Sequence, residues 1–185
     1  MENNVSKLLE AASKNNLERV KQLVKGMDAL LIQNEGWRVA HKAAEKGNVD
    51  MIRFIAKKEP SVLDKKDKNG KGIAHLAVEN GYLSVVQYVD EHRPTILQQD
   101  GQNVAEIAAK NDHFDIVLYL AQKNNSVLAH EYPNNNTVIH LAVKKNLIDA
   151  RTLKFFVEER GIFLQKPNGD SDSIAHIAAR NGNVD

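Results

Sequence analysis

The sequence contains no cysteine and few aromatic residues, with one Trp, four Tyr and five Phe among 185 residues. Without cysteine, the chain has no disulfide bridge, no Cys-ligated zinc and no cysteine nucleophile. It also has no run of about 18 apolar residues, the length that a membrane-spanning helix needs. Its first residues lack the apolar core of a secretory signal. These absences predict a cytoplasmic protein that does not enter membranes.

The chain also lacks a large excess of charge of one sign. The 25 Lys and Arg residues are nearly balanced by 24 Asp and Glu, for a formal charge of +1. A nucleic-acid binder that relies on overall charge is therefore not expected. Leu, Ile, Val and Phe make up 51 of the 185 residues, well above the roughly 20% below which chains stay disordered. The length fits one compact domain or a short repeat array.

A six-residue block recurs along the chain and decides the fold. It reads VAHKAA at 39–44, IAHLAV at 73–78, VAEIAA at 104–109, VIHLAV at 138–143 and IAHIAA at 174–179, with a weaker copy, KLLEAA, at 7–12. Its third position is occupied by Leu9, His41, His75, Glu106, His140 and His176. The intervals between them are 32, 34, 31, 34 and 36 residues.

A turn and a second apolar pattern follow each block. Six residues after the third position stands Gly or Asn in five copies and Asp112 in the other; Gly and Asn tolerate the left-handed backbone that ends a helix. Apolar residues at helical spacing come next, as in Val85, Val86 and Val89. Polar segments then link the repeats and predict turns: 33–36, 66–70, 99–101, 133–136 and 167–170. The sequence therefore predicts an all-α array of stacked helix pairs, because one pair cannot bury its own apolar face.

The combined pattern resembles the ankyrin repeat, whose common form is D-x-x-G-x-T-P-L-H-x-A-A-x-x-G. Residues 67–81, DKNGKGIAHLAVENG, match it best, whereas the Pro of T-P-L-H is replaced by Val or Ile in every copy. The resemblance implies an ankyrin-repeat array over 1–185, with repeats at about 1–33 (the N-terminal cap), 34–66, 67–98, 99–131, 132–166 and a partial 167–185. The array ends where a second helix should begin, so we expect a longer protein and no cover for Ile177 and Ala178. In the fifth repeat the apolar pattern comes about two residues late, which predicts a bend or a longer second helix.

The histidines are predicted to be structural. Stacked helices lie about 8–10 Å apart, too far for equivalent imidazoles to share a zinc ion whose nitrogen ligands sit about 2 Å away. The resemblance implies that His41, His75, His140 and His176 bond to backbone near their turns. No phosphate-binding loop, HExxH or GxSxG motif is present, so neither catalysis nor a cofactor is expected.

What remains is a surface for a partner protein. In ankyrin repeats, turn tips and the exposed positions of the first helices form a concave binding face. The resemblance implies partner-binding roles for nine residues: Trp37, Lys46, Lys68, Lys71, Gln102, Lys110, Asn136, Lys144 and Lys145. The exposed first-helix positions that follow each Ala pair form a column along the repeats. This column becomes purely basic toward the C-terminus, with Lys110, Lys144 and Lys145, which predicts an acidic partner segment there. The alternative for Trp37 is packing over its own turn, and for the lysines a solvated face.

We therefore expect a monomeric, non-enzymatic binding module or scaffold. One alternative is the recruiting arm of an enzyme whose catalytic domain follows residue 185. A weaker one is nucleic-acid binding along the basic column. Lys outnumbers Arg 18 to 7 and there are 19 Asn, as in AT-rich genomes, where such arrays resemble secreted effectors that intracellular bacteria use on host proteins. A eukaryotic cytosolic scaffold fits the same features.

Overall fold

The computed structural model describes residues 2–27, 29–124, 126–162 and 164–182. These residues form α-helices and short 3-10 helices, and they contain no strand, only two isolated bridges, Tyr132–Asn136 and Pro167–Ser173. The chain divides into two compact units, Met1–Leu97 and Gln98–Asp185, called here the N-terminal and C-terminal units. No helix in the described part is long and apolar enough to cross a membrane.

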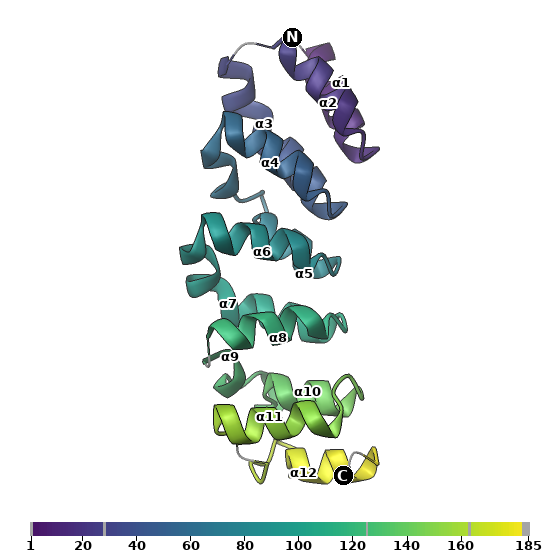
Figure 1. Cartoon of the computed structure of the whole chain (residues 1–185), viewed down its shortest axis with the longest axis vertical. Coiled ribbons are helices and arrows are strands. Elements are labelled where there is room, and N and C mark those ends of the chain that lie inside the picture. Colours follow the sequence, from purple (N-terminus) through teal and green to yellow (C-terminus); the bar gives the residue numbers. More distant parts are fainter. Residues whose placement is uncertain (1, 28, 125, 163, 183–185) are drawn as a thin grey trace. The chain divides into compact units, whose positions relative to one another are not determined.

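The N-terminal unit is a set of antiparallel helix pairs (Figure 1). Its elements are α1 (Glu2–Ser13), α2 (Leu17–Lys25), α3 (Ala29–Glu45), α4 (Val49–Lys58), the 3-10 helix η1 (Pro60–Leu63), α5 (Ile73–Glu79) and α6 (Leu83–His92). Helix α1 pairs with α2, α3 with α4, and α5 with α6, while α3 also packs against both α1 and α5. Helices α1 and α3 thus each touch their own second helix and the first helix of the next pair.

Helix α7 (Pro94–Lys110) runs from the N-terminal unit into the C-terminal one. The remaining elements are α8 (Phe114–Lys123), α9 (Ser126–Ala129), the 3-10 helix η2 (Pro133–Asn135), α10 (Val138–Lys144), α11 (Ala150–Arg160) and α12 (Ile174–Arg180). Helix α10 packs against both α9 and α12. The same alternation of first and second helices therefore continues in this unit.

The turn inside each pair has the predicted left-handed residue. Positive φ angles occur at Asn15, Gly47, Gly81, Asp112, Asn146 and Gly182. Asp112 adopts the conformation as well, with φ 65°, because a short polar side chain tolerates it. Gly47 has a second reason to be glycine, since a Cβ atom there would lie 2.4 Å from the Tyr82 ring. That close approach packs one turn against the next.

Alanine on the first helices and branched residues on the second helices fill the core. Ala43 and Ala44 are fully buried, as are Ile52 and Ile55 on α4. The small side chains let neighbouring first helices approach closely, and the larger ones supply most of the buried apolar area, at roughly 25 cal/mol per Å². The predicted apolar stripes are confirmed as the buried faces of the second helices.

Two of the predicted turns are wrong: residues 33–36 lie inside α3 and residues 99–101 inside α7. The spacing explains the difference. From the third block position to the Leu that ends each repeat, the chain keeps 22 residues in four copies, as from His41 to Leu63. From that Leu to the next block it has 12 residues before His75 but only 10 before His41 and 9 before Glu106. Where two or three residues are missing, the helix continues instead of forming a hairpin-like turn.

The fifth repeat takes its extra residues in the turn. Elsewhere the N-cap of the second helix directly follows the left-handed residue, as Asn48 follows Gly47. After Asn146, Leu147 and Ile148 intervene before the cap Asp149, so α11 starts two residues late. Helix α11 is one continuous α-helix of 11 residues.

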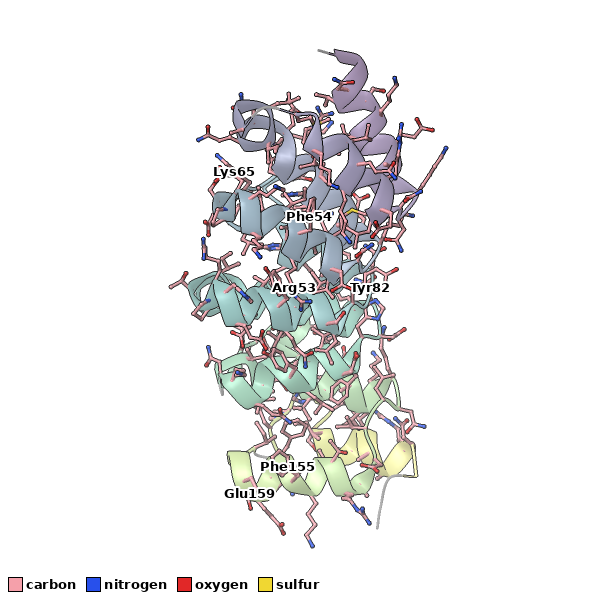
Figure 2. The ribbon with its side chains drawn as sticks, turned by 45° about the horizontal axis from the view of Figure 1, so that its top comes forward. Arg53, Phe54, Lys65, Tyr82, Phe155 and Glu159 are labelled. Carbon is pink, nitrogen blue, oxygen red and sulfur yellow. The ribbon has the colours of Figure 1, made fainter. Side chains whose placement is uncertain are left out.

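The last two helices differ in how far their apolar side chains are exposed. Phe155 of α11, labelled with Glu159 in Figure 2, is 40% exposed. By contrast, Ile177 and Ala178 of α12, which were expected to lack cover, are buried, because α12 packs on α10. The predicted exposed apolar end is therefore wrong for these two residues.

Helix α5 offers a test of how these repeats are stabilised. Gly72 stands at its N-cap in an extended conformation (φ −94°, ψ −179°) without a side-chain cap bond, and a Cβ atom there meets only ordinary contacts. We expect Gly72→Ser to be more stable than the Gly72→Ala control by about 0.5–2 kcal/mol, the value of a serine cap. Urea unfolding of the full chain measures the difference. Equal stability of the two variants would contradict the capping argument.

Candidate functional site

One loop of the N-terminal unit is built as a rigid hairpin-like turn. We call residues 64–72, between η1 and α5, the finger. The Asp67 amide donates to the Lys71 carbonyl (2.8 Å), and the Asp67 carboxylate accepts from the amides of Asn69 (2.8 Å) and Lys71 (2.9 Å). These bonds to the charged form, led by that from Lys71, lower the pKa of Asp67. The aspartate therefore closes the turn from inside.

A histidine ties the finger to the preceding first helix. His41 of α3 is buried, and its Nε2 lies 3.2 Å from the Lys71 carbonyl oxygen of the finger. Its Nδ1 lies 2.7 Å from the carbonyl oxygen of Trp37, one turn earlier in α3. The rings of Trp37 and His41 meet edge to face, with centroids 5.2 Å apart. The structure thus brings Trp37 and Lys71 to the same place, with Lys68 on the same finger.

Two ion pairs hold the ends of the finger. The Arg93 guanidinium contacts both carboxylate oxygens of Asp64 (3.1 and 3.2 Å) and the carbonyl oxygen of Pro60 (3.3 Å). At the other end, Lys71 Nζ lies 2.5 Å from the Glu79 carboxylate on α5. The finger is therefore fixed to α3, α5 and the segment that follows α6.

The N-terminal positions expected to contact a partner, on turn tips or at the end of a first helix, have mixed outcomes. Trp37 lies inside α3 and is half-buried, so its predicted place at a turn tip is wrong; the missing residues that fuse the turn into α3 are the reason. Lys68 is exposed on the finger and Lys46 is exposed just beyond α3, while Lys71 is half-buried against Glu79.

In the C-terminal unit, much of the predicted basic column is neutralised by its own neighbours. Lys110 pairs with Glu106 (2.5 Å), and Lys145 pairs with Asp112 (2.5 Å) while also donating to the Lys110 carbonyl (3.0 Å). Lys144 is exposed at the end of α10, and no ion pair joins it to a carboxylate among the described residues. Lys144 is thus the one lysine of this trio without a direct ion pair in the described ranges, although its charge also acts on Asp172.

Two other predicted contact residues do not form the expected surface. Asn136 is buried, with 9% exposure, and its side-chain oxygen accepts from Asn168 Nδ2 (2.9 Å), so its predicted exposure at a turn tip is wrong. The amide joins successive turns instead of facing solvent. Gln102 lies in α7, but its side chain falls outside the described residues.

Three of the four block histidines, His41, His140 and His176, bond to caps or turns. Thr137 and His140 form a reciprocal capping box at the start of α10, as do Ser173 and His176 at the start of α12. His140 Nε2 also lies 3.0 Å from the Lys166 carbonyl oxygen. No group of three or more His, Asp or Glu in the described ranges could hold a metal ion.

Sequence reasoning missed the lysines that flank Lys68. Lys57 and Lys58 end α4, and Lys65 and Lys66 open the finger; all four are exposed. Lys65 is labelled in Figure 2 on the loop that follows α4 and η1. The six lysines within 57–71 are visible in the sequence. They do not occupy equivalent positions in successive repeats, so a comparison of repeat positions does not reveal them.

Comparison with known proteins identifies the family. A family model described as ankyrin repeats (3 copies) matches residues 8–100 and 61–131. The chain therefore belongs to the ankyrin-repeat family. A search of curated proteins found no match.

A solved structure supports the same fold. A chain in "Bd0816 Predatory Endopeptidase from Bdellovibrio bacteriovorus in complex with immunity protein Bd3460" is similar over 96% of this chain and 92% of its own length. The sequence identity is 21% and the TM-score 0.66. At this identity the likeness establishes the fold alone.

The buried His140 predicts a measurable pH dependence. Burial lowers its pKa below the ordinary 6.5, and Thr137 N donates to Nδ1, so the neutral ring carries its proton on Nε2. Because the unfolded chain takes up this proton first, the stability linked to His140 is present above pH 6.5 and falls as the pH drops below it. NMR titration is expected to give a midpoint below 6.5 for this ring. A midpoint at or above that value would refute the assignment.

Proposed function

We propose that the chain is a non-enzymatic module that binds another protein on the concave face formed by its first helices and turns. The observation that carries the proposal is the finger, because it holds exposed lysines on a turn fixed by Asp67 and by His41, whose ring contacts the chain's one tryptophan. A preorganised surface loses little conformational entropy on binding, and Trp is enriched among residues that dominate binding energy. Membership of the ankyrin-repeat family and the similar chain found in a two-protein complex support this function.

The biological setting is a second part of the proposal. We favour an effector that acts on host proteins in the cytosol as a monomer, on the basis of the Lys- and Asn-rich composition. The alternative is an array that recruits substrates for a catalytic domain located C-terminal to residue 185. Full-length sequence and the reactions of the full-length protein distinguish the two.

Affinity capture tests the binding function. The full chain, immobilised through its N-terminus, is compared with a Trp37→Ala variant and analysed by quantitative mass spectrometry of captured lysate proteins. We expect at least one protein to be retained by the wild type and depleted with the variant, and the purified partner to bind directly. A thermal melt checks that Trp37→Ala remains folded. If no retained protein binds directly when purified, the proposed function is wrong.

The C-terminal unit yields a separate prediction about charge. Lys144 is the column lysine that forms no ion pair with a carboxylate among the described residues, so we propose that it attracts an acidic part of the partner. Lys144→Glu is expected to slow association by roughly threefold to tenfold at low salt, with a smaller effect at high salt. Stopped-flow kinetics with the purified partner measures the rate.

A matched control lies on a different helix of the same unit. Lys154 of α11 is also exposed, and its contact with Glu158 is long, at 3.8 Å. Lys154→Glu makes the same change in net charge. If the two variants slow association equally, or if neither does at low salt, the Lys144 proposal fails.

A further inference from the structure

We infer that the segment from the end of α4 through the finger, residues 57–71, is a docking surface for an acidic peptide segment of a partner protein. The inference rests on the proposed function, since it names the chemistry of the partner and the place of contact. It moves the main cationic contact from the C-terminal unit, where sequence reasoning put it, to the N-terminal unit.

The charge of the chain is concentrated in this segment. It contains six lysines and three carboxylates. Over the whole N-terminal unit, 16 Lys and Arg stand against 13 Asp and Glu, whereas the C-terminal unit has 9 against 11. The excess positive charge of the N-terminal unit is therefore equal to that of 57–71 alone.

Each of the three carboxylates in the segment is already engaged. Hydrogen bonds from Ser61, first from its side chain and then from its amide (3.2 Å), lower the pKa of Glu59. Asp64 pairs with Arg93, and Asp67 closes the finger by accepting two backbone amides. These acids are held by local bonds at the base and inside the turn.

Three of the six lysines are not held at ion-pair distance by a carboxylate of the described chain. Lys57, Lys65 and Lys68 are exposed, and within the described part of the chain no ion pair joins any of them to a carboxylate. Lys71, in contrast, is committed to Glu79. The segment thus presents several ammonium groups from a backbone that does not have to rearrange on binding.

The turns of the C-terminal unit show the opposite arrangement. The turns around residues 133–136 and 167–170 contain one lysine, Lys166, and it pairs with Glu131 (2.7 Å). The turns also bond to each other, with Asn134 Nδ2 donating to Asp170 (2.8 Å) and the Gly169 amide donating to the Asn134 carbonyl (2.7 Å). Their polar groups are used between repeats, which leaves the finger as the cationic turn of the described chain.

The residue types favour an acidic peptide over a nucleic acid. Residues 57–71 contain no Arg and no aromatic side chain, the groups that pair with phosphate in a fork or stack on bases. Lysine is a point charge on a flexible stem and suits carboxylates whose positions vary. A short stretch rich in Asp and Glu matches it in charge without requiring a fixed geometry.

Fluorescence anisotropy with a defined probe tests the inference. The full chain is titrated into a fluorescein-labelled peptide of eight glutamates at 50 mM NaCl, as wild type and as the double variant Lys65→Glu/Lys68→Glu. We expect the double variant to bind about tenfold more weakly or worse, and the difference to shrink at 500 mM NaCl because salt screens exposed charges. The intrinsic fluorescence of Trp37, whose ring contacts His41, provides an independent signal of binding at the finger.

The matched control is Lys7→Glu/Lys25→Glu, which changes the net charge equally at exposed lysines of α1 and α2. The control is expected to change affinity less than about twofold. Equal weakening by both double variants, or tighter lysine-dependent binding of an eight-residue oligothymidylate than of the glutamate peptide, would overturn the inference. Circular dichroism melts confirm that each variant is folded.

The same variants separate this inference from the proposed function. If a partner captured by the wild type binds Lys65→Glu/Lys68→Glu unchanged, the finger assignment is wrong while protein binding stands. If the glutamate peptide binds through these lysines but no partner is captured, the protein-binding function is wrong and the surface chemistry stands.

Discussion

The imidazole that reaches from a first helix to the carbonyl group of the next turn connects local structure to function in this chain. His41 makes this contact with Lys71, and His140 makes it with Lys166. Each contact brings a buried ring to a turn carbonyl; the Lys71 carbonyl also accepts from the Asp67 amide, so the imidazole adds a second contact there. The contact therefore sets the position of the turn relative to the helix before it. The first of these two contacts ties the finger to α3.

The helix pairs tolerate little variation, and the turns absorb it. Within a pair, buried residues such as Ile52 and Ile55 must face the first helix. A residue inserted into the helix itself would therefore rotate the apolar face away from the core. Between pairs, the chain only has to reach the next first helix, either through a closed turn, as at Asp67, or through a continuous helix, as in α3 and α7. The same fold therefore displays different surfaces at successive repeats.

Most of the fold could be predicted from the sequence because it depends on periodic apolar residues and on left-handed turn positions, both visible in single letters. The continuous helices α3 and α7 were not predicted, since Gly36 and Gly101 suggested turns and only the shortened spacing to His41 and Glu106 shows otherwise. The candidate site was partly predicted: His41 joins Trp37 to Lys71 of the finger, which also carries Lys68. Whether a lysine is paired depends on three-dimensional neighbours, such as Asp112 beside Lys145, and no sequence pattern contained that information.

The finger's conformation depends on Asp67, His41, backbone amides and the ion pairs at its two ends, and in the described part of the chain no ion pair to a carboxylate involves Lys65 or Lys68. Selection can therefore replace those lysines one at a time without a folding penalty to compensate. Related arrays would then diverge fastest at these positions while retaining the aspartate and the histidine. Over evolutionary time, a lineage could acquire a new binding target by changing only the tip of one loop, leaving the scaffold beneath it untouched.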